Sequence, residues 1–230
     1  MGNVREPQKI TSIEKKSKII EAGLKIFGEK GYYNTNTVEI AKVAGVSTGI
    51  VYSYFKDKKD ILLQVIKLYF KNIFAPIQEF LNNLKEINKQ SLNDFLKIAI
   101  KSHEDSYLLH EEMIALSHLD ENVHSEFMNF ELEVNEKLLK VLDDHNLKFS
   151  DTKEKVHLAY NLVENLCHEY VYHKHKNINY EKIIELTTKT LLYIFAKWSF
   201  YYLCHKFAQK KCRIFAKVLF FSVLFLYCVI

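Results

Sequence analysis

Residues 45–49, Gly-Val-Ser-Thr-Gly, are the first stretch whose residue types and spacing could perform chemistry. They match the G-x-S-x-G nucleophile elbow, in which a strand enters a strained turn and exposes the serine for acyl transfer. The preceding residues 38–44, Val-Glu-Ile-Ala-Lys-Val-Ala, instead have the apolar spacing of a helix. No alternating strand pattern occurs elsewhere in the chain. We therefore expect no hydrolase, and no enzyme of another class.

Imidazole and thiol groups near Cys167 are the second candidate for chemistry. His168 follows it directly, and His173 and His175 come soon after. These groups are Zn²⁺ ligands, so a metal sensor is an alternative. However, His168 and His173 are five residues apart, which does not place them on one helix face. Because HExxH and CxxC motifs are also absent, we expect ordinary solvated or core histidines, with no metal and no cofactor.

The composition indicates which elements position these residues. The 230 residues include only 6 Gly and 2 Pro, whereas a sheet needs many turns that use these two residue types. The sequence therefore predicts an all-α fold. Apolar periodicity predicts a helix from 57 that Pro76 kinks or ends. The other expected helices cover residues 12–30, 37–44, 47–54, 91–118, 121–145, 152–175 and 180–203.

Residues 37–56 satisfy the steric demands of two helices packed steeply across a tight turn. Ala41 supplies a small residue at the crossing, and Gly45 tolerates the positive φ of the turn. Val46 is expected to fill the core after the turn, with a β-branched residue at 50 or 51 facing back. The first of these helices begins in a polar stretch, and its N-cap is one of residues 35–37. This pattern predicts a helix-turn-helix whose second helix enters the DNA major groove.

The candidate DNA contacts are mainly small hydrogen-bonding residues and tyrosines suited to base edges and phosphates. Lys58 adds an ammonium group at a helix N-terminus, where a phosphate is favoured. Tyr54 is suited to the core, although its hydroxyl could reach a phosphate, and the two threonines before the first helix could be caps only. The full candidate set is Thr35, Thr37, Ser47, Thr48, Gly49, Tyr52, Ser53, Tyr54 and Lys58.

The positive charge is concentrated near the N-terminus. Residues 1–60 hold 11 Lys and Arg against 7 Asp and Glu, which accounts for the whole net charge of +4. A basic head on a neutral body is typical of a phosphate-binding module joined to a regulatory body. Ordinary scatter in charge is the alternative explanation.

The run from residue 27 to 62 resembles the N-terminal DNA-binding domain of TetR/AcrR-type bacterial regulators. The shared pattern is F-x-x-x-G-Y, then T-x-x-I-A-x-x-A-G-V-S-x-G-x-x-Y-x-Y-F, then K-x-x-L. The resemblance implies that Tyr52, Tyr54 and Lys58 lie where phosphate or base contacts occur, although many members carry His in place of Tyr54. It covers residues 12–72. It also implies a helical C-terminal domain, residues 73–203, that binds a small effector and forms a homodimer.

Aromatic and imidazole side chains of the C-terminal domain could line an effector pocket. An apolar or aromatic effector would suit them, although such residues are more often ordinary core. The candidates are His103, Tyr107, His110, Phe127, Phe130, Tyr160 and His168. For the homodimer, residues 156–171 and 183–202 are rich in Leu, Ile, Tyr and Phe, and pairing them with their symmetry mates would form a four-helix bundle.

Residues 204–230 form an apolar tail. The uncharged part, 218–230, is shorter than the roughly 18 residues that a membrane span needs. We expect the tail to pack on the protein or attach irregularly, with no membrane span. The N-terminus has no apolar run resembling a signal peptide, so a cytoplasmic location is expected.

Together these features predict a transcription regulator, a repressor, that binds a pseudo-palindromic double-stranded DNA operator as a homodimer. A small effector would release it from DNA. The alternative is a helical sensor or interaction protein that has lost operator binding.

Overall fold

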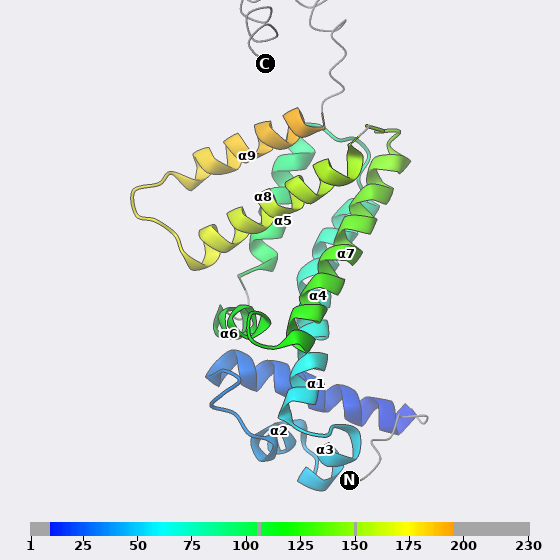
Figure 1. Ribbon diagram of the computed structural model, residues 1–230, viewed down its shortest axis with the longest axis vertical. Coiled ribbons are helices and arrows are strands. Elements are labelled where there is room, and N and C mark those ends of the chain that lie inside the picture. Colours follow the sequence, from blue (N-terminus) through cyan, green and yellow to red (C-terminus); the bar gives the residue numbers. More distant parts are fainter. Residues whose placement is uncertain (1–9, 105–106, 150, 196–230) are drawn as a thin grey trace, which may run out of the picture. The chain divides into compact units, whose positions relative to one another are not determined.

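A computed structural model describes residues 10–104, 107–149 and 151–195, and these parts are helical without a strand. The all-α prediction is therefore confirmed (Figure 1). The helices of the described residues are α1 Ile10–Lys30, α2 Thr37–Ala44, α3 Thr48–Tyr54, α4 Lys58–Asn82, α5 Lys89–Ser102, α6 Tyr107–Ser117, α7 Glu121–Asp144, α8 Thr152–Tyr172 and α9 Tyr180–Ile194.

The start of α2 is a capping box. The Asn36 side chain accepts from the backbone N–H of Glu39, and the Glu39 side chain accepts from the backbone N–H of Asn36. Two backbone donors that a helix leaves unpaired are satisfied in this way. Asn36 is thus the N-cap among the three residues that the sequence left open.

The corner between α2 and α3 has the predicted sterics. Gly45 has φ 67°, a left-handed conformation that L side chains rarely adopt, and the next residue's N–H donates to Ala41 O at 3.0 Å. Ala41 and Val51 are buried at the helix crossing. Val46 and Ile50 pack partly buried against the same core. Ser47 caps α3, as predicted.

The core runs without interruption from the first four helices into α6 and α7. In Figure 1, α1 lies across one end of the long helix α4. Phe27 of α1 and Val65 of α4 are fully buried there, together with Leu109 and Met113 of α6. The expected boundary between residues 72 and 73 falls inside α4, so this helix connects the head to the body.

The structure corrects two helix predictions. The single helix expected at 91–118 is divided into α5 and α6, because His103 ends α5: its Nδ1 bonds to Ala99 O at 2.7 Å and its backbone N–H donates to Ile100 O. Pro76 does not end α4, which continues to Asn82. Burial of the neighbouring Phe74 and Ile77 stabilises the helix across the proline.

The far end of the body is built from α5, α8 and α9, which pack against one another, while α7 packs on α4 and α8. Within the described residues, no helix is long and apolar enough to cross a membrane. The tail 204–230 and the end of the predicted interface, residues 196–202, lie outside the described residues.

Candidate nucleic-acid interface and histidine cluster

The short helix α3 presents a polar face because Val51 and Tyr54 turn toward the core. Ser47, Gly49, Tyr52 and Ser53 are exposed, and Thr48, the other predicted contact on this helix, is half-buried. The exposed residues are small or hydrogen-bonding, so DNA could approach this surface closely.

Two exposed hydroxyls join α2 to α3. Thr37 Oγ1 and the Tyr52 hydroxyl are hydrogen-bonded to each other at 2.9 Å. The Tyr52 ring itself is half exposed. This bond holds the phenol at the open side of the corner, where it remains available to a phosphate or a base edge.

Thr35 and Tyr54, two of the candidate DNA contacts, are buried in the head, and their contact with DNA remains a prediction. Thr35 is 3% exposed, and its Oγ1 donates to Gly31 O at 2.9 Å. Tyr54 is a core residue at 9% exposure. Both positions therefore stabilise the head, as the alternative interpretations of these residues allowed.

The ammonium group of Lys58 is bonded within the protein rather than free to bind a phosphate. Its Nζ donates to the backbone oxygens of Tyr32 and Thr35, each at 2.7 Å, and lies 4.3 Å from the centre of the Tyr32 ring. Burial lowers the pKa of this ammonium group. Lys58 thus ties the loop between α1 and α2 to the start of α4, and a phosphate contact remains a prediction.

Two contacts connect the head to the body, and sequence reasoning missed both. The Tyr32 backbone N–H donates to the Glu112 carboxylate of α6. Lys59, in the first turn of α4, forms an ion pair of 2.5 Å with Asp120, the N-cap of α7. Neither pair has a short sequence separation, so local spacing could not reveal it.

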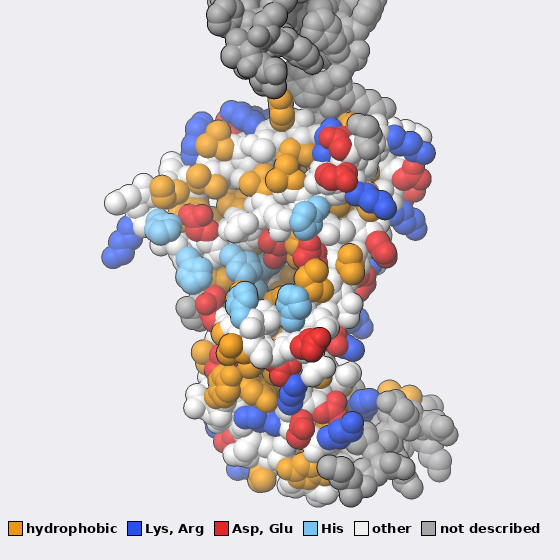
Figure 2. All heavy atoms as spheres, viewed as in Figure 1, with side chains coloured by type: hydrophobic (Ala, Val, Ile, Leu, Met, Phe, Trp, Pro, Cys, Tyr) orange, Lys and Arg blue, Asp and Glu red, His pale blue; other side chains and the backbone are white. Residues whose placement is uncertain are grey.

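Three predicted effector residues, His103, His110 and His168, form one cluster. His110 Nε2 lies 2.9 Å from His168 Nε2, and His110 Nδ1 lies 2.7 Å from the Tyr69 hydroxyl of α4. The ring of Tyr172 stacks on His110 at 4.7 Å between centres. Figure 2 shows His side chains gathered with acidic ones on one face of the body.

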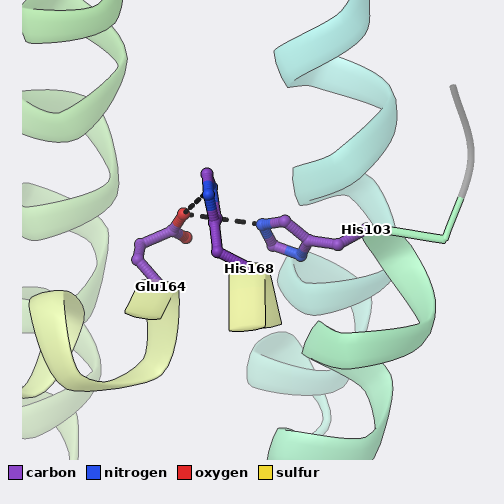
Figure 3. A group of neighbouring side chains, drawn as sticks. All are labelled: His103, Glu164 and His168. Carbon is purple, nitrogen blue, oxygen red and sulfur yellow. Dashed lines mark ion pairs between the residues drawn. The ribbon is translucent and has the colours of Figure 1, made fainter. Parts of the chain in front are cut away.

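Glu164 completes this cluster and was not among the predicted residues. Its Oε2 lies 3.5 Å from His103 Nε2 and 3.9 Å from His168 Nε2 (Figure 3). Glu164 and His168 are four residues apart on α8, a spacing that places them on one helix face and could have revealed the pair.

The cluster shifts the pKa values of His103 and His110 in opposite directions. Burial disfavours charge on His103, but hydrogen bonds with Cys167 and Glu164 outweigh it and raise its pKa to about 11. Burial and the neighbouring His168 and His103 lower the pKa of His110 to about 3. His110 is therefore neutral, whereas His103 is favoured as an imidazolium cation beside the Glu164 carboxylate.

The other predicted effector residues form different contacts, or their side chain is undescribed. Phe127 and Phe130 pack on Phe70 of α4, the latter stacked at 4.2 Å between ring centres. Tyr160 is half-buried on α8, and burial raises its pKa. Tyr107 begins α6, but its side chain lies outside the described residues.

The sequence comparisons identify the head. The family model "Bacterial regulatory proteins, tetR family" matches residues 19–65. The regulator HbdR of Aromatoleum sp. (strain CIB) is 50% identical over 54 residues, which are 24% of each chain. The icaADBC biofilm operon negative regulator IcaR of Staphylococcus aureus (strain Newman) is 27% identical over 150 residues, covering 60% of this chain and 74% of IcaR. The chain thus spans about a quarter of the length of HbdR.

The fold of the chain beyond the head also resembles that of TetR-family regulators. A TetR-family regulator structure from Mesorhizobium loti MAFF303099 superposes with a TM-score of 0.67 at 18% identity, covering 81% of this chain and 98% of the other. Residues 19–65 therefore match the DNA-binding domain of the TetR family of bacterial regulatory proteins, and the described helices share the fold of a TetR-family regulator.

Proposed function

We propose that this protein is a repressor that binds a pseudo-palindromic DNA operator as a homodimer and leaves it when an effector binds the body. The observation that carries the proposal is the exposed polar face of α3 on a capped, sterically consistent helix-turn-helix. Such a recognition helix enters the major groove, and a dimer places two of them on one side of the duplex. The negative regulator IcaR supports repression over activation.

The predicted DNA contacts retained in this proposal are those that remain accessible. They include the Thr37–Tyr52 pair that joins α2 to α3, and Lys58 at the start of α4. The proposed contacts are Thr37, Ser47, Thr48, Gly49, Tyr52, Ser53 and Lys58.

The homodimer would form through α8 and α9. Leu158 of α8 and Leu186 of α9 are about half exposed, which is costly for large apolar side chains facing water. Pairing the two helices with those of a second copy would bury them in a four-helix bundle. The cytoplasm is the proposed location.

Effector coupling would pass through α6. This helix places Leu109 and Met113 in the core of the head, Glu112 against the loop after α1, and His110 in the histidine cluster. A ligand that changed the position of α6 would therefore change the spacing of the two heads. The polar character of the cluster favours a polar or charged effector over the apolar one expected from sequence.

Operator binding can be tested on DNA fragments selected from a random double-stranded pool by the full chain. We expect two protomers per selected fragment in analytical ultracentrifugation, and an affinity that falls steeply with added salt. Binding that is indifferent to salt, or absent while the folded dimer persists, would favour the alternative of a helical sensor that has lost operator binding.

A further inference from the structure

The side chains of His103, His168 and Glu164 converge from two helices that are distant in sequence. His103 ends α5, and the other two lie one turn apart on α8 (Figure 3). One ligand atom from each lies within 4.8 Å of the other two. His103 is 2% exposed, and the other two are half-buried, so the donors are held away from bulk water.

The donor spacing approaches that of ligands on one metal ion. Tetrahedral Zn²⁺ with bonds of about 2.0–2.2 Å separates neighbouring donors by roughly 3.3–3.5 Å. Here Glu164 Oε2 lies 3.5 Å from His103 Nε2 and 3.9 Å from His168 Nε2. His110 Nε2, at 2.9 Å from His168 Nε2, is within reach of the fourth position. Small side-chain rotations would complete the site.

The surrounding hydrogen bonds are those that metal-binding histidines use. His103 Nδ1 is bonded to Ala99 O, and His110 Nδ1 is bonded to the Tyr69 hydroxyl. Such partners orient the ring and direct Nε2 toward the ion. With its Nδ1 proton directed at Ala99 O, a neutral His103 presents a lone pair to the Glu164 carboxylate. Nε2 and the carboxylate are then both acceptors, so either a proton or a metal ion must lie between them.

We infer that His103, Glu164 and His168 form a binding site for one divalent transition-metal ion of the Zn²⁺ class, with His110 beside it. Imidazole and carboxylate together suit Zn²⁺, Co²⁺ or Ni²⁺, whereas Mg²⁺ prefers oxygen ligands and retains its waters. The bound ion would connect the end of α5 to α8. Metal binding by this cluster does not depend on operator binding by the head. An experiment can therefore contradict one proposal without contradicting the other.

In the metal-free protein, a proton on His103 Nε2 would also satisfy the Glu164 carboxylate. Metal titration distinguishes this protonated state from the metal-bound state. The full chain, stripped with a chelator and dialysed, is titrated with Zn²⁺ in a calorimeter, and with Co²⁺ for its visible absorption. We expect one ion per chain, a Co²⁺ spectrum typical of mixed nitrogen and oxygen ligands, and no Mg²⁺ binding. Zn²⁺ should also raise the thermal midpoint.

The variants Glu164→Gln and His168→Gln should each weaken Zn²⁺ binding at least tenfold. Both residues are half-buried, so metal-free folding, checked by circular dichroism, should be retained. The matched controls are Glu131→Gln and His157→Gln, which break another Glu–His ion pair, at 3.0 Å, outside the cluster. The control variants should bind Zn²⁺ with the affinity of the parent. No Zn²⁺ binding by the parent, or binding that survives in both cluster variants, would overturn the inference.

Discussion

The hydroxyls of Thr37 and Tyr52 are hydrogen-bonded at 2.9 Å, and this bond joins the two helices of the helix-turn-helix on their exposed side. Thr37 is the first residue of α2, and Tyr52 lies near the end of α3. The pair therefore fixes the phenol at the surface that faces DNA in the proposed complex, without tying it into the core.

Tyr52→Ala should weaken DNA binding about tenfold or more while leaving stability within roughly 0.5 kcal/mol, because the ring is half exposed and its truncation opens no cavity. Tyr52→Phe should have a smaller effect, since it removes only the hydroxyl. Fluorescence anisotropy with a selected DNA fragment measures both. Equal affinities for the parent and both variants would exclude Tyr52 from the interface.

Gly45→Ala should lower the free energy of unfolding by about 1–2 kcal/mol, because φ is 67° and an L side chain is strained there even with open space around it. Gly49→Ala is the matched control. It lies in helical backbone without a close neighbour, so the substitution should leave stability unchanged or slightly raised. Chemical denaturation distinguishes the two, and a stable Gly45→Ala protein would contradict the role of the turn.

Lys58→Met should lower the free energy of unfolding by about 1–2 kcal/mol, since the ammonium group bonds two backbone oxygens of the loop after α1. Lys56→Met, at an exposed position nearby, should not. The salt dependence of DNA binding adds a second readout: the slope decreases by about 1 in the Lys58 variant if this residue also binds a phosphate. Unchanged stability would show that the loop does not need this contact.

Glu112→Ala should lower the free energy of unfolding by about 1–2 kcal/mol, because the Tyr32 N–H loses its acceptor. Glu136→Ala, at an exposed position on α7, provides the comparison. If α6 transmits the effector response, Glu112→Ala should alter the loss of DNA affinity caused by the effector. It should alter the DNA affinity of the effector-free protein less. A stability equal to that of the parent would argue against this link between the head and the body.

The free energy of unfolding should depend on pH through His110. Its folded pKa of about 3 lies below the ordinary value of 6.5, so the folded state binds fewer protons, and stability falls as pH drops from 6.5 toward 3. The full slope is about 1.4 kcal/mol per pH unit. Burial also lowers the pKa of His168, which adds to the same trend, whereas His103 is protonated in both states within this window.

Denaturation at several pH values, comparing the parent with His110→Asn, isolates this contribution. In the metal-free chain, the dependence of the free energy of unfolding on pH should be less steep below pH 6.5 in the variant, by up to the contribution of one proton. Identical slopes in the parent and the His110 variant would contradict a neutral, buried His110. The titratable groups that face His110 are Tyr69, His103, His168, Tyr172 and His173.

The head could be predicted because its constraints are local. A small residue at 41, a left-handed turn at Gly45 and an N-cap before α2 all lie within a few residues of one another. The break after His103 could not, because apolar residues continue on both sides of it and the helix end is set by the His103 contact with Ala99. The cluster was foreseen only in part, since His103 and Glu164 meet through tertiary packing.

The face of α3 is proposed to contact the bases of an operator, and selection from a random double-stranded DNA pool tests this contact. The parent and Tyr52→Ala would be compared in the same number of rounds at physiological salt. We expect the parent to enrich one inverted repeat, consistent with two recognition helices related by two-fold symmetry, and Tyr52→Ala to enrich it poorly. Failure of the parent to enrich any sequence, or equal enrichment by the variant, would contradict it.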